Sequence, residues 1–115
     1  MIRPLDLVPP MARLFRSLGD EGRLTLLETL IDYEQRVGDL VQKSGQSQST
    51  VSTHLGALHA AGLVARRAEG KQAWYGVAHP SVGAMLNAAE EVVIAASEES
   101  YACVSPCCNP APGAA

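Results

Sequence analysis

The chain has 115 residues and a mass of 12.1 kDa, which suffices for one small domain with one hydrophobic core. Hydrophobic residues make up 47% of it and aromatic residues only 4%, a composition that favours packed helices over a β-sandwich. No run approaches the roughly 18 apolar residues of a membrane span, and the start lacks the apolar run of a signal peptide. We therefore expect a cytoplasmic protein with no membrane partner.

The net charge of -3 seems to argue against nucleic acid, but the charges are unevenly distributed. The acidic residues gather before Arg36 and near the C-terminal end, whereas the segment from Arg36 to His79 is basic. This segment holds Arg36, Lys43, Arg66, Arg67 and Lys71 against Asp39 and Glu69. A chain of this kind can present one basic face to DNA phosphates and stay soluble.

Prolines gather at both ends of the chain, and this placement predicts the domain boundaries. We expect residues 1–10 to form an N-terminal extension, residues 11–100 to form the folded domain, and residues 101–115 to form a flexible tail that carries all three cysteines.

Three helices are expected in the first part of the domain. Ala12, Phe15 and Leu18 lie on one face of a first helix that ends at Gly19. Asp20 is the expected N-cap of a second helix, whose apolar positions are Leu24, Leu27, Leu30 and Ile31. A short third helix carries Val37, Leu40 and Val41, and it stops near Ser44 and Gly45.

The stretch SQSTVSTHLGALHAAG predicts a fourth helix with a polar outer face. Ser47 can cap it, and Val51, Leu55 and Leu58 recur at the spacing of an inward face. This leaves Gln48, Ser49, Ser52 and Thr53 together on the outside near its N-terminus. Gly62 fits the left-handed position after the helix, and Leu63 can close the hydrophobic contact of a Schellman ending.

A β-hairpin and a last helix complete the domain. LVARR and QAWYGV read as two short strands around AEGK, which puts Arg66, Arg67 and Lys71 at or near the tip. Pro80 fits the first turn of a last helix. The apolar stripe of that helix needs a partner, which a second copy of the chain can supply; it comprises Val82, Met85, Leu86, Ala89, Val93 and Ala96.

A short helix, a glycine turn, a capped helix with small polar side chains and a basic hairpin together predict a winged helix-turn-helix that binds double-stranded DNA. The candidate DNA-binding residues are Ser47, Gln48, Ser49, Thr50, Ser52, Thr53, His54, Arg66, Arg67 and Lys71. His54 is as well placed to support helix packing as to touch a phosphate. A polar helix face of this kind also occurs in proteins that bind nothing, so the face alone decides little.

The runs LFRSLGDEGRLTLLETL and VGDLVQKSGQSQSTVSTHLGALHAAGLVARRAEGKQAWYGV resemble the ArsR/SmtB family of bacterial metal- and metalloid-responsive repressors over roughly residues 12–79. The resemblance implies a mainly α-helical winged helix-turn-helix with about five helices and a two-stranded wing, forming a homodimer through its terminal helices. It also implies a repressor, not an enzyme, that binds an operator overlapping its own promoter and releases it when an effector binds.

Two sensing sites of the family do not match this sequence. Many members carry an ELCVCD-type box, and the matching stretch here is EQRVGD, with Arg36 and Gly38 at the thiol positions. Others bind zinc through Asp and His residues of the last helix, but this chain has neither residue between Val82 and Ser100.

The tail YACVSPCCNPAPGAA then becomes the candidate effector site, with Cys103, Cys107 and Cys108 as the metal ligands. Three thiolates suit As(III), and they also suit Cd(II), Pb(II) or Hg(II), because soft ligands select soft ions. We favour As(III) and expect no organic cofactor.

Three alternatives remain for these thiols. The first is oxidation or persulfide sensing, with a disulfide as the switch. The second is that the tail is disordered and the thiols are incidental. The third, an oxidoreductase or metalloid reductase, is the weakest, because the chain has no C-x-x-C motif and no phosphate-binding glycine loop.

Overall fold

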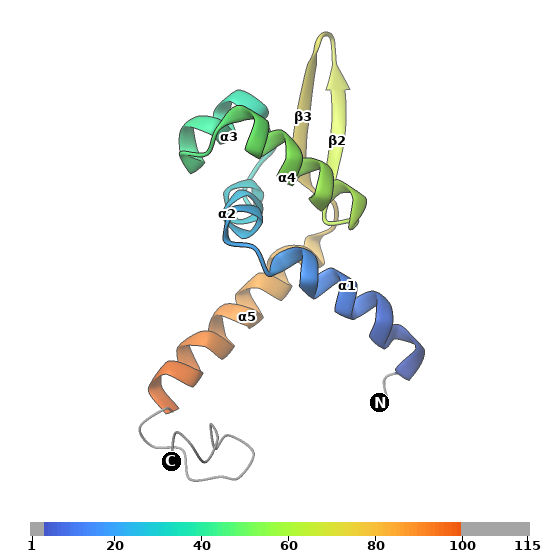
Figure 1. Cartoon of the computed structure of the whole chain (residues 1–115), viewed down its shortest axis with the longest axis vertical. Coiled ribbons are helices and arrows are strands. Elements are labelled where there is room, and N and C mark those ends of the chain that lie inside the picture. The colour runs from blue at the N-terminus through green and yellow to red at the C-terminus, as the bar shows by residue number, and fades with distance from the viewer. Residues whose placement is uncertain (1–3, 100–115) are drawn as a thin grey trace. The chain divides into compact units, whose positions relative to one another are not determined.

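The computed structural model describes residues 4–99, except for the side chains of Glu98 and Glu99. A short 3-10 helix, η1 (Leu5–Leu7), precedes α1 (Val8–Leu18) and α2 (Glu21–Leu30). Next come β1 (Gln35–Arg36), α3 (Val37–Ser44), α4 (Gln48–Ala60), β2 (Val64–Glu69), β3 (Gln72–Val77) and α5 (Pro80–Glu99) (Figure 1). The mainly α-helical winged helix-turn-helix that the sequence predicts is confirmed. Cys103, Cys107 and Cys108 lie outside the described residues.

The chain divides into two units, and the division lies inside α5, after Gly83. The first turn of α5 belongs to the first unit, where Val82 is buried and the open side of Gly83 faces Ile31. Farther along α5, the side chains of Val92, Val93 and Ile94 are more than half exposed. The predicted apolar stripe is therefore covered near the start of α5 and uncovered toward its end.

Among the described residues, helical structure begins at Leu5, within the segment that we expected to form an N-terminal extension. Residues 5–7 form η1, and α1 begins at Val8 with prolines in its first turn. A proline is tolerated there because the first N–H groups of a helix have no intrahelical acceptor. The face of α1 that we expected to be apolar is largely uncovered, and the Phe15 side chain is 53% exposed.

The core of the first unit lies where α2, α3 and α4 meet, a contact visible in Figure 1. Its fully buried side chains are mostly leucines, and they include the three positions predicted for the inward face of α4. These residues are Leu26, Leu27, Leu30, Leu40, Val51, Leu55 and Leu58. Burial of apolar side chains of this size stabilises a fold by about 1.5–3 kcal/mol each relative to exposure.

The wing belongs to an antiparallel sheet of three strands in the order β1-β3-β2, not two. β1 adds Gln35 opposite Tyr75 and Arg36 opposite Trp74. Gln35 is buried, and its amide donates to the Thr29 carbonyl at 2.6 Å and accepts from Lys43 Nζ at 2.7 Å. Because a polar side chain takes the inward position of this two-residue strand, no apolar alternation marked it in the sequence.

The predicted helix ends are confirmed. Asp20 caps α2 by accepting the Arg23 N–H at 3.0 Å, and Ser47 caps α4. Gly62 has φ 81°, its N–H donates to His59, and the Leu63 N–H donates to Leu58, which is the paired bonding of a Schellman ending. Within residues 4–99, no helix has the length and apolar character needed to cross a membrane.

Candidate nucleic-acid interface

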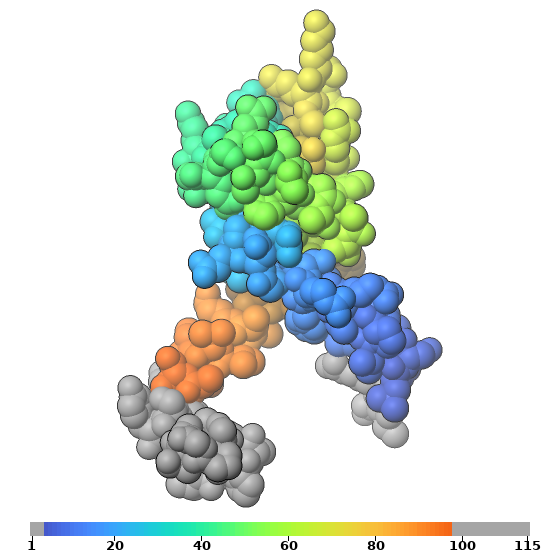
Figure 2. Space-filling model, in the orientation of Figure 1, coloured from blue at the N-terminus to red at the C-terminus, as the bar shows by residue number. Residues whose placement is uncertain are grey.

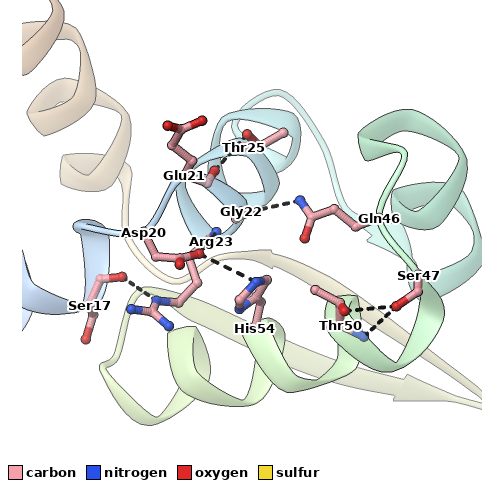
Figure 3. Close-up of polar contacts among 10 residues, drawn as sticks. All are labelled: Ser17, Asp20, Glu21, Gly22, Arg23, Thr25, Gln46, Ser47, Thr50 and His54. Carbon is pink, nitrogen blue, oxygen red and sulfur yellow. Dashed lines mark hydrogen bonds and ion pairs between the residues drawn. The ribbon is translucent and has the colours of Figure 1, made fainter.

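The first turn of α4 is held by a cluster of hydroxyl groups (Figure 3). Ser47 Oγ accepts the Thr50 N–H at 3.2 Å and donates to Thr50 Oγ1 at 2.9 Å. It also lies 3.3 Å from Ser49 Oγ. Ser47 and Thr50, both predicted DNA-binding residues, are thus engaged in fixing where the helix begins.

Three polar side chains on the outer face of α4 are free. Gln48, Ser52 and Thr53 are exposed, and within the described part of the chain they make no side-chain hydrogen bond. Gln48 begins the helix and Ser52 and Thr53 lie in its second turn, close to the end where unsatisfied N–H groups and the helix dipole attract phosphate. An amide and two hydroxyls in this position can bond to the edges of bases in a major groove.

His54 points away from that outer face, toward the start of α2. Its Nε2 lies 3.5 Å from Oδ2 of Asp20, and its side chain is 17% exposed (Figure 3). Its Nδ1 is buried, with no partner among the described residues. The structure thus places His54 between the two helices that it joins.

The wing carries its basic residues on two different faces of the hairpin. Alternate residues of a strand point to opposite faces, so Arg66 shares a face with the buried Val64, and Arg67 lies on the other. Arg66 and the turn residue Lys71 are exposed and have no charged partner in the described part of the chain. Figure 2 shows the hairpin, in yellow, standing out beyond the green surface of α3 and α4.

Arg67, by contrast, is paired. Its guanidinium donates to both carboxylate oxygens of Glu34 and to Glu69, with the shortest distance 2.8 Å from Nη2 to Glu34 Oε1. The hydrogen bond from Arg67 lowers the pKa of Glu34, and the same bond raises the pKa of Arg67. Of the three predicted basic contacts, Arg66 and Lys71 are free and Arg67 is not.

The comparisons with known proteins agree with this geometry. Residues 20–66 match the family described as bacterial regulatory protein, arsR family. The probable mercury resistance operon repressor of Streptomyces lividans is 36% identical over 102 residues, which cover 89% of this chain and 78% of that protein. The crystal structure of Mycobacterium tuberculosis Rv0081 superposes with a TM-score of 0.76 at 30% identity, covering 88% of this chain and 100% of that one.

A solution structure from Mycobacterium bovis is described as a homodimeric winged helix-turn-helix DNA-binding domain of a possible ArsR-family regulator. It superposes with a TM-score of 0.73 at 28% identity and covers 83% of this chain and 88% of its own. The chain belongs to the ArsR family. It is a DNA-binding transcriptional repressor with a winged helix-turn-helix, and it is not an enzyme.

In this ArsR-family chain, the stretch that matches the thiol box of other members is used for packing and helix capping. The Arg36 guanidinium lies 5.3 Å from the centre of the Trp74 ring and donates to Gln72 at 3.3 Å. Asp39 accepts the Arg36 N–H at 3.2 Å, and this bond lowers the pKa of Asp39. Among residues 4–99, no group of three or more His, Cys, Asp or Glu side chains is arranged to hold a metal ion.

Sequence reasoning missed the polar residues that join α2 to α1 and to the segment just before α4, the recognition helix. Gln46 donates from Nε2 to the Gly22 carbonyl at 3.1 Å, and Arg23 donates from Nε to the Ser17 carbonyl at 2.6 Å (Figure 3). The one sequence signal was Gly22, a glycine inside a helix. A Cβ at that position would lie 2.7 Å from His54 Nε2.

Proposed function

We propose that this repressor binds its operator through the outer face of α4 and the wing. The observation that carries the proposal is that some polar side chains of α4 and the wing have partners within the described part of the protein and others have none there. Gln48, Ser52 and Thr53 are exposed and unpaired at the start of α4, and Arg66 and Lys71 are exposed and unpaired on the wing. Side chains with no internal partner lose no hydrogen bond when they bind bases or phosphates.

We also propose that two copies associate through the terminal helices. Exposed large apolar side chains include Leu5, Leu7, Val8 and Phe15 on η1 and α1 of the first unit, and Val92, Val93 and Ile94 on α5 of the second unit. Exposed apolar surface of this extent is typical of interaction sites. The homodimeric relative from Mycobacterium bovis supports this arrangement. A dimer would read two half-sites about one helical turn apart.

The proposed effector is a thiophilic ion held by Cys103, Cys107 and Cys108. Three thiolates close together suit As(III), our first candidate, and the relative from Streptomyces lividans named for mercury resistance supports Hg(II) as the second. Cd(II) and Pb(II) are further soft ions of the same class.

Release of DNA requires the ion to bind more tightly to one state of the repressor than to the other. A typical coupling of this kind is about 1–3 kcal/mol, or roughly 5- to 150-fold in affinity. Ion binding at the tail would therefore weaken operator binding by a factor in this range.

The test measures release of DNA by fluorescence anisotropy on a labelled duplex selected from a random pool with the unmodified protein. As(III), Hg(II), Cd(II), Pb(II) and Zn(II) are titrated in turn. We expect As(III) or Hg(II) to release the duplex from the unmodified protein. Cys103→Ser, Cys107→Ser and Cys108→Ser should bind the duplex with unchanged affinity but hold it in the presence of the ion.

Two outcomes would overturn this assignment. Normal release by all three serine variants would remove the tail from the mechanism. Release by peroxide or polysulfide without release by any ion would identify thiol oxidation as the signal.

A further inference from the structure

Arg67 on β2 is held by a side chain that comes from the opposite edge of the sheet. Its Nε lies 3.2 Å from both Oε1 and Oε2 of Glu34, and its Nη2 lies 2.8 Å from Oε1. Glu34 directly precedes β1, and β3 lies between β1 and β2. The ion pair therefore joins the two outer strands of the sheet across the middle one.

Gly76 on β3 makes this crossing possible. A Cβ at Gly76 would lie 3.1 Å from Cγ of Glu34, closer than an ordinary van der Waals contact. Gly76 is paired with Ala65 on β2, so neither residue presents a large side chain on the path. The Glu34 side chain can consequently lie flat over the sheet and reach Arg67.

The ion pair of Glu34 and Arg67 lies at the point where β1 stops pairing with β3. Trp74 is opposite Arg67 on β2 and opposite Arg36 on β1, and it lies 5.8 Å and 5.3 Å from the two guanidinium groups. β1 pairs with β3 at Trp74 and Tyr75. From residue 68 to residue 73 the hairpin consists of β2 and β3 alone. Its direction therefore depends on the contacts that fix Arg36, Trp74 and Arg67, the last row in which three strands are paired.

The charge around Arg67 also argues against a phosphate contact. Glu34 and Glu69 both contact its guanidinium, so a DNA phosphate would have to displace or approach two carboxylates. Arg66 has no such partner in the described part of the chain and lies on the opposite face of β2. Two adjacent arginines thus differ in what they can offer to DNA.

We propose that Arg67 is a positioning residue of the wing and not a phosphate contact: Glu34, passing over Gly76, clamps Arg67 against Trp74 and sets the direction of the hairpin that carries Arg66 and Lys71. This inference rests on the proposed DNA-binding surface. It assigns Glu34, Gly76 and Trp74 a role in operator binding without contact with DNA.

The experiment measures affinity for the selected duplex as a function of salt concentration. Each phosphate contact contributes about one to the slope of log affinity against log salt. Arg66→Ala should lower that slope by about one for each protomer. Arg67→Ala should leave the slope unchanged and lower affinity by about threefold, which corresponds to the loss of an exposed ion pair.

Glu34→Gln should change DNA-binding affinity in opposite directions for the two possible roles of Arg67. It should weaken binding about as much as Arg67→Ala if the clamp positions the wing, but strengthen binding if it frees a phosphate-binding arginine. Asp32→Asn is the matched control, because Asp32 is an exposed neighbour whose change removes the same charge and leaves the clamp intact. The double variant of Glu34 and Arg67 should be no weaker than either single variant.

Circular dichroism establishes that each variant is folded, and Arg67→Gln replaces Arg67→Ala if the latter unfolds. A fall in salt slope with Arg67→Ala, stronger binding with Glu34→Gln than with Asp32→Asn, or unchanged affinity in both clamp variants would each overturn the inference. If Arg66→Ala leaves the slope unchanged while the Arg67 variants behave as expected, the proposed DNA-binding surface fails at Arg66 instead.

Discussion

Nε2 of His54, in the recognition helix, lies 3.5 Å from Oδ2 of Asp20, the residue that caps α2. The same carboxylate oxygen accepts the Arg23 N–H, and the side chain of Arg23 donates to the Ser17 carbonyl of α1. One polar cluster therefore links α1, the start of α2 and the middle of α4. The orientation of the helix that carries Gln48 depends on contacts at its opposite, inward side.

Gly22→Ala should disturb this junction. The new Cβ would lie 2.7 Å from His54 Nε2 and 3.1 Å from both Asp20 Oδ2 and Gln46 Oε1, so the His54 side chain must move. We expect a loss of about 1 kcal/mol in unfolding free energy and weaker DNA binding. Gly38→Ala is the control, since Gly38 also stands second in its helix and its Cβ would meet nothing within 4 Å.

In a His54→Ala background, Gly22→Ala should no longer destabilise the protein, because the nearest obstacle is gone and alanine favours a helix over glycine by roughly 0.5–1 kcal/mol. Urea denaturation of the four proteins of this cycle measures the effect. An equal loss in both backgrounds would show that His54 does not occupy the space beside Gly22.

Ser47→Ala should remove the cap of the recognition helix at a cost of about 1 kcal/mol in unfolding free energy. The Thr50 N–H would lose its acceptor, and the Thr50 hydroxyl would lose its donor. Ser52→Ala, on the same helix but without a side-chain bond in the described chain, should change stability by less than about 0.5 kcal/mol. Thermal and urea unfolding compare the two variants, and equal effects would contradict a capping role.

Gln48→Ala should reduce discrimination between DNA sequences more than it reduces binding to DNA in general. A glutamine that pairs with a base edge contributes about 1–3 kcal/mol of discrimination, and it carries no charge, so the salt dependence should stay unchanged.

Lys71→Ala is the contrasting variant for Gln48→Ala. It should weaken binding to the selected duplex and to a second duplex of scrambled sequence alike, as measured by fluorescence anisotropy, and lower the salt slope by about one for each protomer. If Gln48→Ala instead weakened binding to both duplexes equally, we would assign Gln48 a contact with the DNA backbone and not with a base.

Acid should destabilise the protein through Asp20 and Glu34. The Arg23 N–H lowers the pKa of Asp20 from its ordinary 3.8, and the Arg67 side chain lowers the pKa of Glu34 from its ordinary 4.5. The folded state therefore binds fewer protons than the unfolded state in this range. Their stabilisation is complete above these ordinary values and is lost as the pH falls through the lower values of the folded state.

Urea denaturation at a series of pH values below about 5 measures this dependence. Asp20→Asn and Glu34→Gln should each flatten the decline, and Glu28→Gln, an exposed change on α2, serves as the control. A decline of the same steepness in all four proteins would contradict the assignment.

Local signals were enough to predict the five α-helices and the β2–β3 hairpin, but not β1. Asp20 and Ser47 cap their helices, Gly62 ends α4, and Pro80 begins α5, because each of these residues satisfies or avoids a backbone hydrogen bond within a few positions of itself. The 3.6-residue period of Val51, Leu55 and Leu58 likewise identified the buried face of α4.

The partners of the polar side chains were decided by the tertiary structure. Arg66 and Arg67 are neighbours of the same type in the sequence, and Glu34 lies 33 positions before Arg67. Only the pairing of β1, β3 and β2 brings that carboxylate over Gly76 to one arginine and leaves the other free. His54 and Asp20 meet in the same way, when α4 packs on α2. Sequence periodicity determines which face of an element is buried, whereas a polar contact between distant residues requires the packing that places them a few ångströms apart.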